Sequence, residues 1–256
     1  GSHNIAIGYL AFSSADNVES NNVALGAFAM YNVDNDSSNK NVAIGHGAFG
    51  GGTGAISESI AIGYQAGDGT GTIGGTQNIF IGMHAGGGSW ATAVSNYNTA
   101  IGGTAMAGAL NGALGNTGVG YNALKQITEG DYNTVLGYEA LYTGTTVNNS
   151  VVIGKDAMKS VPAGQAVENV TAIGTGALAG SASTTDGING TVAIGFSAGN
   201  DLTTGSGNTL VGYMSGDELL TGDNNTCLGR HTLNNADGDE DDNTCIGYLA
   251  GTTIDN

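Results

Sequence analysis

Proline, basic residues and cysteine are scarce in this chain: its 256 residues include one proline, five lysines and arginines, and two cysteines. A single proline excludes collagen, even with 47 glycines, because the triple helix combines Gly-X-Y triplets with abundant proline. Two cysteines cannot form the disulfide framework of a small secreted protein. Apolar runs are short, and none approaches the roughly 20 residues of a membrane-spanning helix, so we expect no insertion into a membrane.

Positive charge is also nearly absent, since the five basic residues face 22 acidic ones and the formal net charge is −17. A nucleic-acid-binding protein needs a basic surface that displaces counterions from phosphates, and this sequence offers none. We therefore expect no nucleic-acid partner. The acidity is interpreted as a source of solubility for a sheet-rich particle, with cation binding as the alternative.

What the chain has instead is one phrase repeated 14 times, as in residues 133–141 (NTVLGYEAL) and 243–251 (NTCIGYLAG). We number each copy from its central glycine, so that position −1 precedes this anchor glycine and +1 follows it. The anchor glycines recur every 17 to 21 residues: Gly8, Gly26, Gly45, Gly63, Gly82, Gly102, Gly120, Gly137, Gly154, Gly174, Gly195, Gly212, Gly229 and Gly247. We predict a single repeat domain over residues 4–256, with Gly-Ser-His at 1–3 as the remnant of an expression tag.

The residue types at fixed positions of the copies predict strands. Position −1 is always Ile, Leu or Val, and position −3 is always Val, Ile or Thr, an alternation at period two that indicates a strand. Position −4 is Asn in ten copies and +3 is Ala in 12. Stacked coils would turn each position into a ladder of like residues about 4.8 Å apart. We expect the Ile, Leu and Val columns to fill the interior and the Asn amides to chain from coil to coil.

The predicted fold is all-β: a parallel β-solenoid of about 14 coils of 17–21 residues, with no helix longer than two turns. An anchor glycine in every copy argues against helices, because each would cost about 1 kcal/mol relative to alanine. The left-handed hexapeptide helix of many acyltransferases is the second choice. It is less favoured because it needs an aliphatic residue near every sixth position, and segments such as 125–133 are polar. We favour a two-walled roll, in which a second short strand starts at the Ala of +3 and a polar loop absorbs the variation in length.

The phrase Asn-[Thr/Val/Ser]-x-Ile-Gly-x-x-Ala resembles the repeat in the heads of trimeric autotransporter adhesins (YadA-like) and repeats in bacteriophage tail fibres. Residues 41–49 (NVAIGHGAF) and 59–67 (SIAIGYQAG) match most closely, and the resemblance covers about residues 4–251. It implies a left-handed parallel β-roll, a homotrimer and a role in adhesion. The coils are longer than those of the adhesin heads, and no neck, stalk or anchor is visible, so we expect a fragment or processed product of a longer fibre.

We therefore expect a non-enzymatic adhesive or structural fibre module that binds a cell-surface receptor or glycan. A phage tail-fibre segment, extracellular or on the virion, is the first choice, and a bacterial surface adhesin head is the alternative. Two further alternatives are a solenoid enzyme (a glycan depolymerase or an acyltransferase) and an ice-binding protein. Thr recurs at −3 in seven copies, as an ice-binding ladder would require, but Val and Ile share this position and predict side chains that point inward.

Aromatic residues are the candidate binding residues. The +1 position holds six tyrosines and one phenylalanine: Tyr9, Tyr64, Tyr121, Tyr138, Phe196, Tyr213 and Tyr248. Such a column either covers the turn or offers rings for stacking on sugars or on a partner subunit. We also expect recognition by the variable loops 84–97 and 179–190, and an exposed contact from Trp90, the only tryptophan.

The acidic run 235–243 (NADGDEDDN) is a weak candidate for a calcium site, through Asp237, Asp239 and Asp241. It is no EF-hand, because Asp242 and Tyr248 would stand where that loop needs Gly and Glu. We interpret the run as a solvated loop and expect no cofactor. The histidines have no ligand or triad spacing, and the glycine-rich GGGS at 86–89 lacks the lysine of a phosphate-binding loop, so no catalytic residue is predicted.

Cys227 and Cys245 both occupy position −2, in neighbouring copies. Neighbouring strands lie about 4.8 Å apart, a Cα separation that a disulfide can bridge. Parallel in-register side chains are poorly oriented for that bond, so we favour a free pair of thiols.

Overall fold

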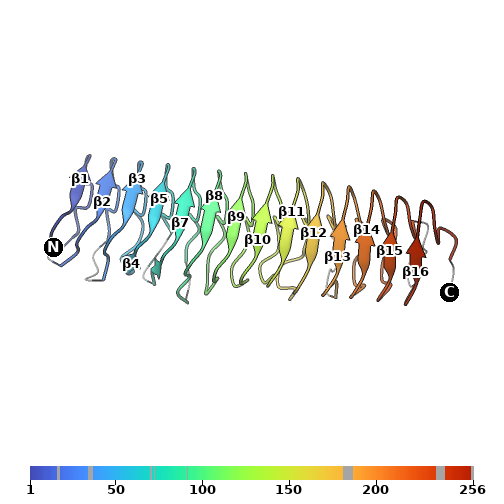
Figure 1. Cartoon of the computed structure of the whole chain (residues 1–256). Coiled ribbons are helices and arrows are strands. Elements are labelled where there is room, and N and C mark those ends of the chain that lie inside the picture. The colour runs from blue at the N-terminus through green and yellow to red at the C-terminus, as the bar shows by residue number, and fades with distance from the viewer. Residues whose placement is uncertain are drawn as a thin grey trace. The chain divides into compact units, whose positions relative to one another are not determined.

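The structure, a computed structural model, describes residues 1–15, 18–33, 37–69, 71, 73–90, 92–180, 187–234 and 240–254. It divides into two compact units, Gly1–Asp131 and Tyr132–Asn256. Each unit is a parallel β-solenoid with one coil per copy of the phrase, and the described residues contain no helix (Figure 1). The predicted fold class is confirmed, while the single domain over residues 4–256 stays a prediction.

Each coil contributes one three-residue strand at positions −3 to −1. The strands of the first unit are β1 (Ile5–Ile7), β2 (Val23–Leu25), β3 (Val42–Ile44), β5 (Ile60–Ile62), β7 (Ile79–Ile81), β8 (Thr99–Ile101) and β9 (Thr117–Val119). Those of the second unit are β10 (Thr134–Leu136), β11 (Val151–Ile153), β12 (Thr171–Ile173), β13 (Val192–Ile194), β14 (Thr209–Val211), β15 (Thr226–Leu228) and β16 (Thr244–Ile246). Within a unit, equal positions pair in parallel, as Ala43 does with Ala61, which is the register that the repeat predicts.

The second wall of the coil differs from the prediction. A strand was expected to start at the Ala of +3, but these residues form a turn. The second ladder precedes the motif instead: β4 (Ile56–Ser57) pairs with β6 (Gly75–Thr76), both at positions −7 and −6, and single bridges join Asn96 to Leu114 and Asn148 to Glu168 at −6. The polar segment before the motif is therefore part of the wall in these coils.

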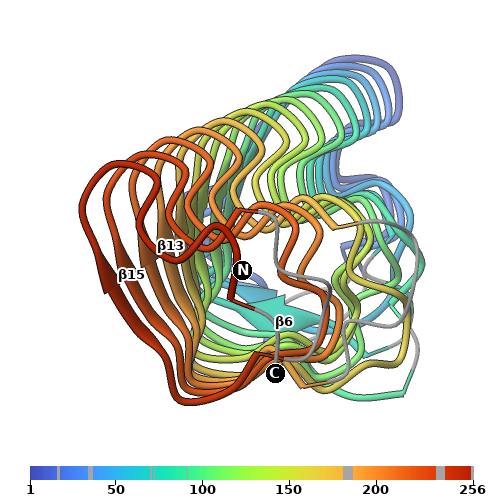
Figure 2. The same cartoon turned by 90° about the vertical axis from the view of Figure 1, so that its right-hand side faces the viewer.

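The turn after each strand stacks on the turn of the next coil (Figure 2). Gly45 has a φ of 130°, and a Cβ added there would collide with the carbonyl oxygen of Gly63, so both conformation and closeness require the anchor glycine. Positions +2 and +4 are left-handed even where they are not glycine, as at Asn122 (φ 57°) and Leu124 (φ 53°). Backbone hydrogen bonds still join the coils around this turn, and they offset part of the cost of such conformations.

On the side of the strands and turns, the interior is built from positions −2, +3 and +4, and this corrects the sequence analysis; aliphatic residues of the segment before the motif, such as Ile56 and Ile127, complete it. Ala43, Ala48 and Phe49 of one coil are buried, whereas the Ile, Leu and Val side chains of −1 and −3 are nowhere buried and point away from the core. The strand turns −2 inward because the interior is narrow: the side chain of +4 occupies most of the space, and a small residue at −2 fits beside it. Where +4 is glycine, −2 can be large: a Cβ at Gly86 would collide with the Phe80 ring.

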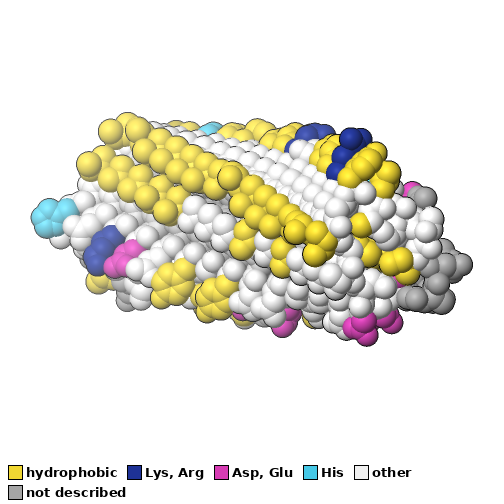
Figure 3. Space-filling model, turned by 45° about the vertical axis from the view of Figure 1, so that its right-hand side comes forward, with side chains coloured by type: hydrophobic (Ala, Val, Ile, Leu, Met, Phe, Trp, Pro, Cys, Tyr) yellow, Lys and Arg dark blue, Asp and Glu magenta, His cyan; other side chains and the backbone are white. Residues whose placement is uncertain are grey.

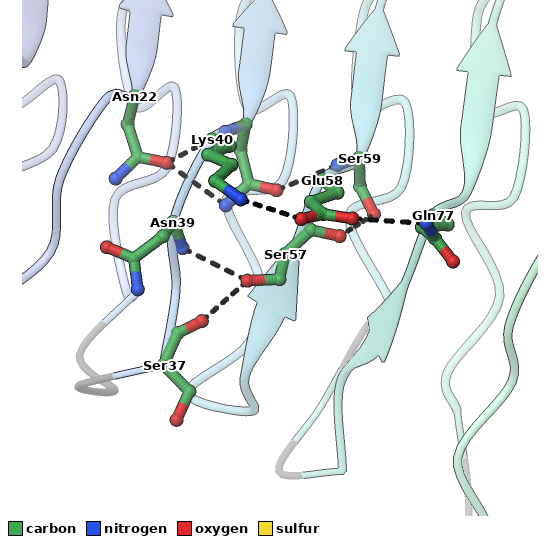
Figure 4. Close-up of polar contacts among 9 residues, drawn as sticks. Asn22, Ser37, Asn39, Lys40, Ser57, Glu58, Ser59 and Gln77 are labelled. Carbon is green, nitrogen blue, oxygen red and sulfur yellow. Dashed lines mark hydrogen bonds and ion pairs between the residues drawn. The ribbon is translucent and has the colours of Figure 1, made fainter.

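A ladder of buried asparagines supports the coil next to each strand, as predicted for −4. In the first unit, Asn22 Oδ1 accepts hydrogen bonds from the backbone N–H (2.9 Å) and the side-chain amide (3.1 Å) of Asn41 in the next coil (Figure 4). Asn41 Nδ2 also donates to Ile56 O (2.8 Å). A second polar ladder at −6 runs in the opposite direction, since Thr76 N–H donates to Asn96 Oδ1 of the following coil (2.8 Å). These ladders satisfy polar groups that the narrow coil buries.

Candidate functional site

The outward face of the strands is the first candidate surface, and we call it the outer stripe: positions −3 and −1 of every strand. Ile7, Leu136 and Ile246 at −1 are 60%, 48% and 65% exposed. Rows of hydrophobic side chains run from coil to coil over this face (Figure 3). Contiguous apolar surface of this kind marks interaction sites in soluble proteins.

The Thr residues of −3 also lie on the outer stripe, which corrects the prediction that this column points inward. Thr134, Thr209, Thr226 and Thr244 of the second unit are exposed, while Thr171 is half-buried. Because the side chains of a strand alternate between faces, −3 and −1 share the outer face once −2 is buried. The stripe is thus wholly apolar in some coils and half hydroxylated in others.

The +1 residues form the second candidate surface, which we call the aromatic column. All seven predicted aromatic residues are exposed, so the column covers the rim of the turn and contacts solvent: Tyr9, Tyr64, Tyr121, Tyr138, Phe196, Tyr213 and Tyr248. Other residues, such as His46 and Arg230, occupy the same column in the remaining coils. The sequence predicted the membership of this column, and the structure shows its exposure.

Ring faces in the aromatic column are used by neighbouring coils. His46 stacks on Tyr64 with centroids 5.4 Å apart and an interplanar angle of 18°, and Phe196 stacks on Tyr213 at 5.1 Å and 13°. The Arg230 guanidinium lies over the rings of Tyr213 (5.3 Å) and Tyr248 (5.8 Å). Rings stacked in this way present their edges and hydroxyl groups to solvent more than their faces.

Trp90 is not an exposed contact, which contradicts the prediction for the loop 84–97. Its side chain is 4% exposed, lies edge-on to the Phe80 ring at 5.9 Å, and donates from Nε1 to the carbonyl oxygen of Gly86 (3.3 Å). Glycine at +4 leaves room for these two large rings. Trp90 therefore stabilises the core of the first unit and cannot serve as a surface anchor.

In each unit an aspartate of one turn lies within electrostatic reach of a histidine of a neighbouring turn, which the sequence analysis missed. Burial and the neighbouring carboxylates of Asp201 and Glu218 raise the pKa of Asp217 to about 6, while His231 opposes the shift. Burial likewise raises the pKa of Asp68, against His84 and His46. In both units an aspartate at +5 faces a histidine at +2 of the next coil, an offset that could be read from the repeat.

The predicted calcium ligands do not form a site in the described residues. Asp237 and Asp239 lie outside them. Asp241 belongs to the −6 ladder, because its Oδ1 accepts a hydrogen bond from Asp223 N (2.7 Å). No group of three His, Cys, Asp or Glu side chains suited to a metal ion occurs in the ranges that the structure describes. Of the loop 179–190, only 179–180 and 187–190 are described.

The two cysteines lie side by side in the core of the second unit. Cys227 of β15 pairs in register with Cys245 of β16, and both thiols are free and buried. Burial raises the pKa of Cys227 to about 12, with Cys245 adding to the shift, so this thiol stays protonated and unreactive at neutral pH. The pair fills space at −2 where the other coils of the second unit have Ala, Val or Leu.

Comparison of the chain with protein families, with characterised proteins and with solved structures finds no match. Among the described residues there is also no helix that could cross a membrane.

Proposed function

We propose that the chain is a non-enzymatic adhesive and structural fibre module that assembles with copies of itself, either in a phage tail fibre or, as the alternative, in the head of a bacterial surface adhesin. The observation that carries the proposal is the outer stripe. A parallel sheet normally has both faces covered, yet one face of this sheet bears an aliphatic side chain in every coil and no covering layer from the described chain.

A second copy of the chain is the partner that fits the stripe best. Both copies would present columns with the same inter-coil spacing of about 4.8 Å, so contacts made in one coil recur in the next. Closed cyclic symmetry then buries the stripe of each copy around a common axis. The resemblance to trimeric adhesin heads favours three copies, and the apolar columns at −1 would form the centre of the trimer.

Assembly through the stripe leaves other surfaces for a receptor or glycan on a cell. The exposed aromatic column and the variable segments are carried on a rigid scaffold, which is the usual place for recognition. We assign the module to the extracellular space or the virion on this basis. The long ladders of Ala, Asn and Gly serve the scaffold, so we propose no catalytic residue.

The mass of the particle in solution tests the assembly. We expect a trimer for the wild type by sedimentation and light scattering, and monomers for Ile44→Lys/Ile62→Lys, which places two charges in the stripe. Gln77→Lys is the matched control, because it adds a charge at an exposed position outside the stripe and should leave a trimer. A monomeric wild type, or a trimeric double variant with an unchanged circular dichroism spectrum, would contradict self-assembly.

Attachment to cells tests the adhesive part. Labelled wild type is expected to bind bacterial cells or their extracted surface glycans without shortening them, as measured by the reducing ends released over a day. Release of reducing ends that grows with protein concentration would replace the proposal with the depolymerase alternative. Absence of binding to all of a broad panel of cells would leave only the structural role.

Ice binding is a second candidate, because the Thr column was set aside on the expectation that it points inward, and it points outward. Within a unit, parallel strands with Thr and aliphatic columns in strict register offer a regular surface to the ice lattice. The two candidates compete for one face. A monomeric wild type with thermal hysteresis that Thr209→Lys/Thr226→Lys abolishes would favour ice binding, whereas a trimer without hysteresis would exclude it.

A further inference from the structure

In the last four coils of the second unit, successive residues of the aromatic column contact one another. Phe196, Tyr213, Arg230 and Tyr248 follow one another at +1, and each contacts the next: ring on ring at 5.1 Å, then guanidinium on ring at 5.3 and 5.8 Å. All four side chains are exposed. We call this group the arginine ladder.

Arg230 differs from Lys40, Lys155 and Lys159 in its partners. Lys40 pairs with Glu58 (2.8 Å), Lys155 with Asp156 (2.9 Å), and Lys159 with both Glu139 (2.6 Å) and Asp156 (3.2 Å). Arg230, the only arginine in a chain with 22 acidic residues, makes no ion pair with any residue that the structure describes. Among the described residues its contacts are aromatic, and they restrict the guanidinium without forming an ion pair.

The geometry leaves the hydrogen-bonding edge of Arg230 available to a ligand. Rings on two sides restrict the guanidinium, and a guanidinium carries its N–H donors in its own plane, in a fork that matches a carboxylate. Tyr213 and Tyr248 place hydroxyl groups in the coils on either side. One cationic fork flanked by two hydroxyl groups on an aromatic surface matches an acidic sugar, whose carboxylate and hydroxyl groups project from an apolar ring.

We propose that the arginine ladder binds a single carboxylate-bearing sugar, such as a uronic or sialic acid residue, within an otherwise neutral glycan. This inference rests on the proposed adhesive function and names the class of its ligand. A polyanion is disfavoured, because the net charge of −17 repels repeated negative charges. One carboxylate in direct contact with Arg230 gains a charge-assisted bidentate bond, which salt screens much less than the long-range repulsion.

Titration with matched sugars tests this binding. Sialyllactose, glucuronyl-galactose and galacturonate each carry one carboxylate; lactose, digalactose and the methyl ester of galacturonate lack the charge; and sulfated lactose carries a different anion. In ligand-observed NMR, we expect wild type to bind at least one carboxylate sugar about tenfold more tightly than its neutral counterpart and than sulfated lactose. Arg230→Gln should remove this preference. Lys155→Gln, in the same column, should keep it.

Several results would overturn the inference. Equal binding by Arg230→Gln, no preference for any carboxylate sugar, or equal affinity for the sulfate would exclude a carboxylate site on the ladder. A lowered particle mass for Arg230→Gln without sugar binding would assign Arg230 to contacts between copies. Equal attachment of wild type and Arg230→Gln to cells would refute the inference, while the proposed adhesive function would stand. Sugar binding by the wild type without attachment to any cell of the panel would keep the inference and leave only the structural part of the proposed function.

Discussion

The two units are built from the same type of coil but differ in the outer stripe. At −3, the first unit has Ile or Val in five of its seven strands, from Ile5 to Ile79, whereas the second has Thr in five of seven, from Thr134 to Thr244. Position −1 is aliphatic in both units. The difference shows that the interior constrains the sequence more than the outer stripe does. Positions −2, +3 and +4 pack into the interior in both units, whereas position −3 varies between aliphatic residues and threonine.

The anchor glycine should have the largest effect, and an equal one in both units. Gly45→Ala and Gly195→Ala each place a Cβ against a carbonyl oxygen of the next anchor glycine at φ values of 130° and 145°, so each should lower the free energy of unfolding by more than about 3 kcal/mol. Gly247→Ala is the control, since φ is also positive (120°) but nothing lies within 4 Å of the added Cβ. Urea unfolding checks this; a Gly247→Ala cost as large as the others would mean that φ alone decides.

Packing between −2 and +4 should come next. Gly216→Leu would drive a side chain into Leu210, and Gly86→Leu would do the same against Phe80, each at a cost of about 2 kcal/mol. The added change Leu210→Ala should recover a large part of that loss in the second unit, because a large +4 residue beside Ala at −2 occurs in other coils, as with Ala172 and Leu178. Double-mutant cycles measure the coupling, and simple additivity would show that the two positions do not compete for space.

Exchange of valine and threonine at −3 should have a smaller effect, on assembly, and it tests whether the difference between the two units at this position matters. If copies assemble through the stripe, Val42→Thr should weaken assembly and Thr209→Val should strengthen it, each by about 1 kcal/mol per chain. The monomer stability of both variants should change little, because the side chains point outward. Dilution series in the analytical ultracentrifuge report the shift; changes of equal sign for both variants would separate the stripe from assembly.

The smallest effect concerns pH. The raised pKa of Asp217 means that its contribution to stability is full below the unfolded pKa of 3.8 and is lost as pH rises through about 6. Asp217→Asn should therefore raise the melting temperature slightly at pH 8, and this advantage should shrink at pH 4. Asp68→Asn should act in the same direction in the first unit. Melting curves at both pH values test this, and an advantage that grows at pH 4 would reverse the assigned sign.

Much of the coil could be predicted because the repeat fixes which residues are equivalent. The strand positions, the parallel register, the Asn ladder and the neighbouring cysteines all follow from 14 copies in phase. The second ladder at −6 was harder to see, since Asn, Asp, Ser and Thr share that position and its bonds run to the next coil. Trp90 was misplaced because its loop looks polar and variable, while its burial depends on the space that Gly86 leaves beside Phe80.

The sequence by itself determined the period, the strand and the register, because like residues at equal positions are stable only when the coils stack in phase. It could not decide which face of the strand is inside. Positions −3, −2 and −1 are all apolar in coils such as Val42–Ile44, and a strand of three residues fits either way. The tertiary structure decided it: the coil is narrow, its space is taken by +3 and +4, and only a residue matched to them fits at −2. The larger Ile, Leu and Val side chains are left outside, where they form the surface on which the proposed assembly depends.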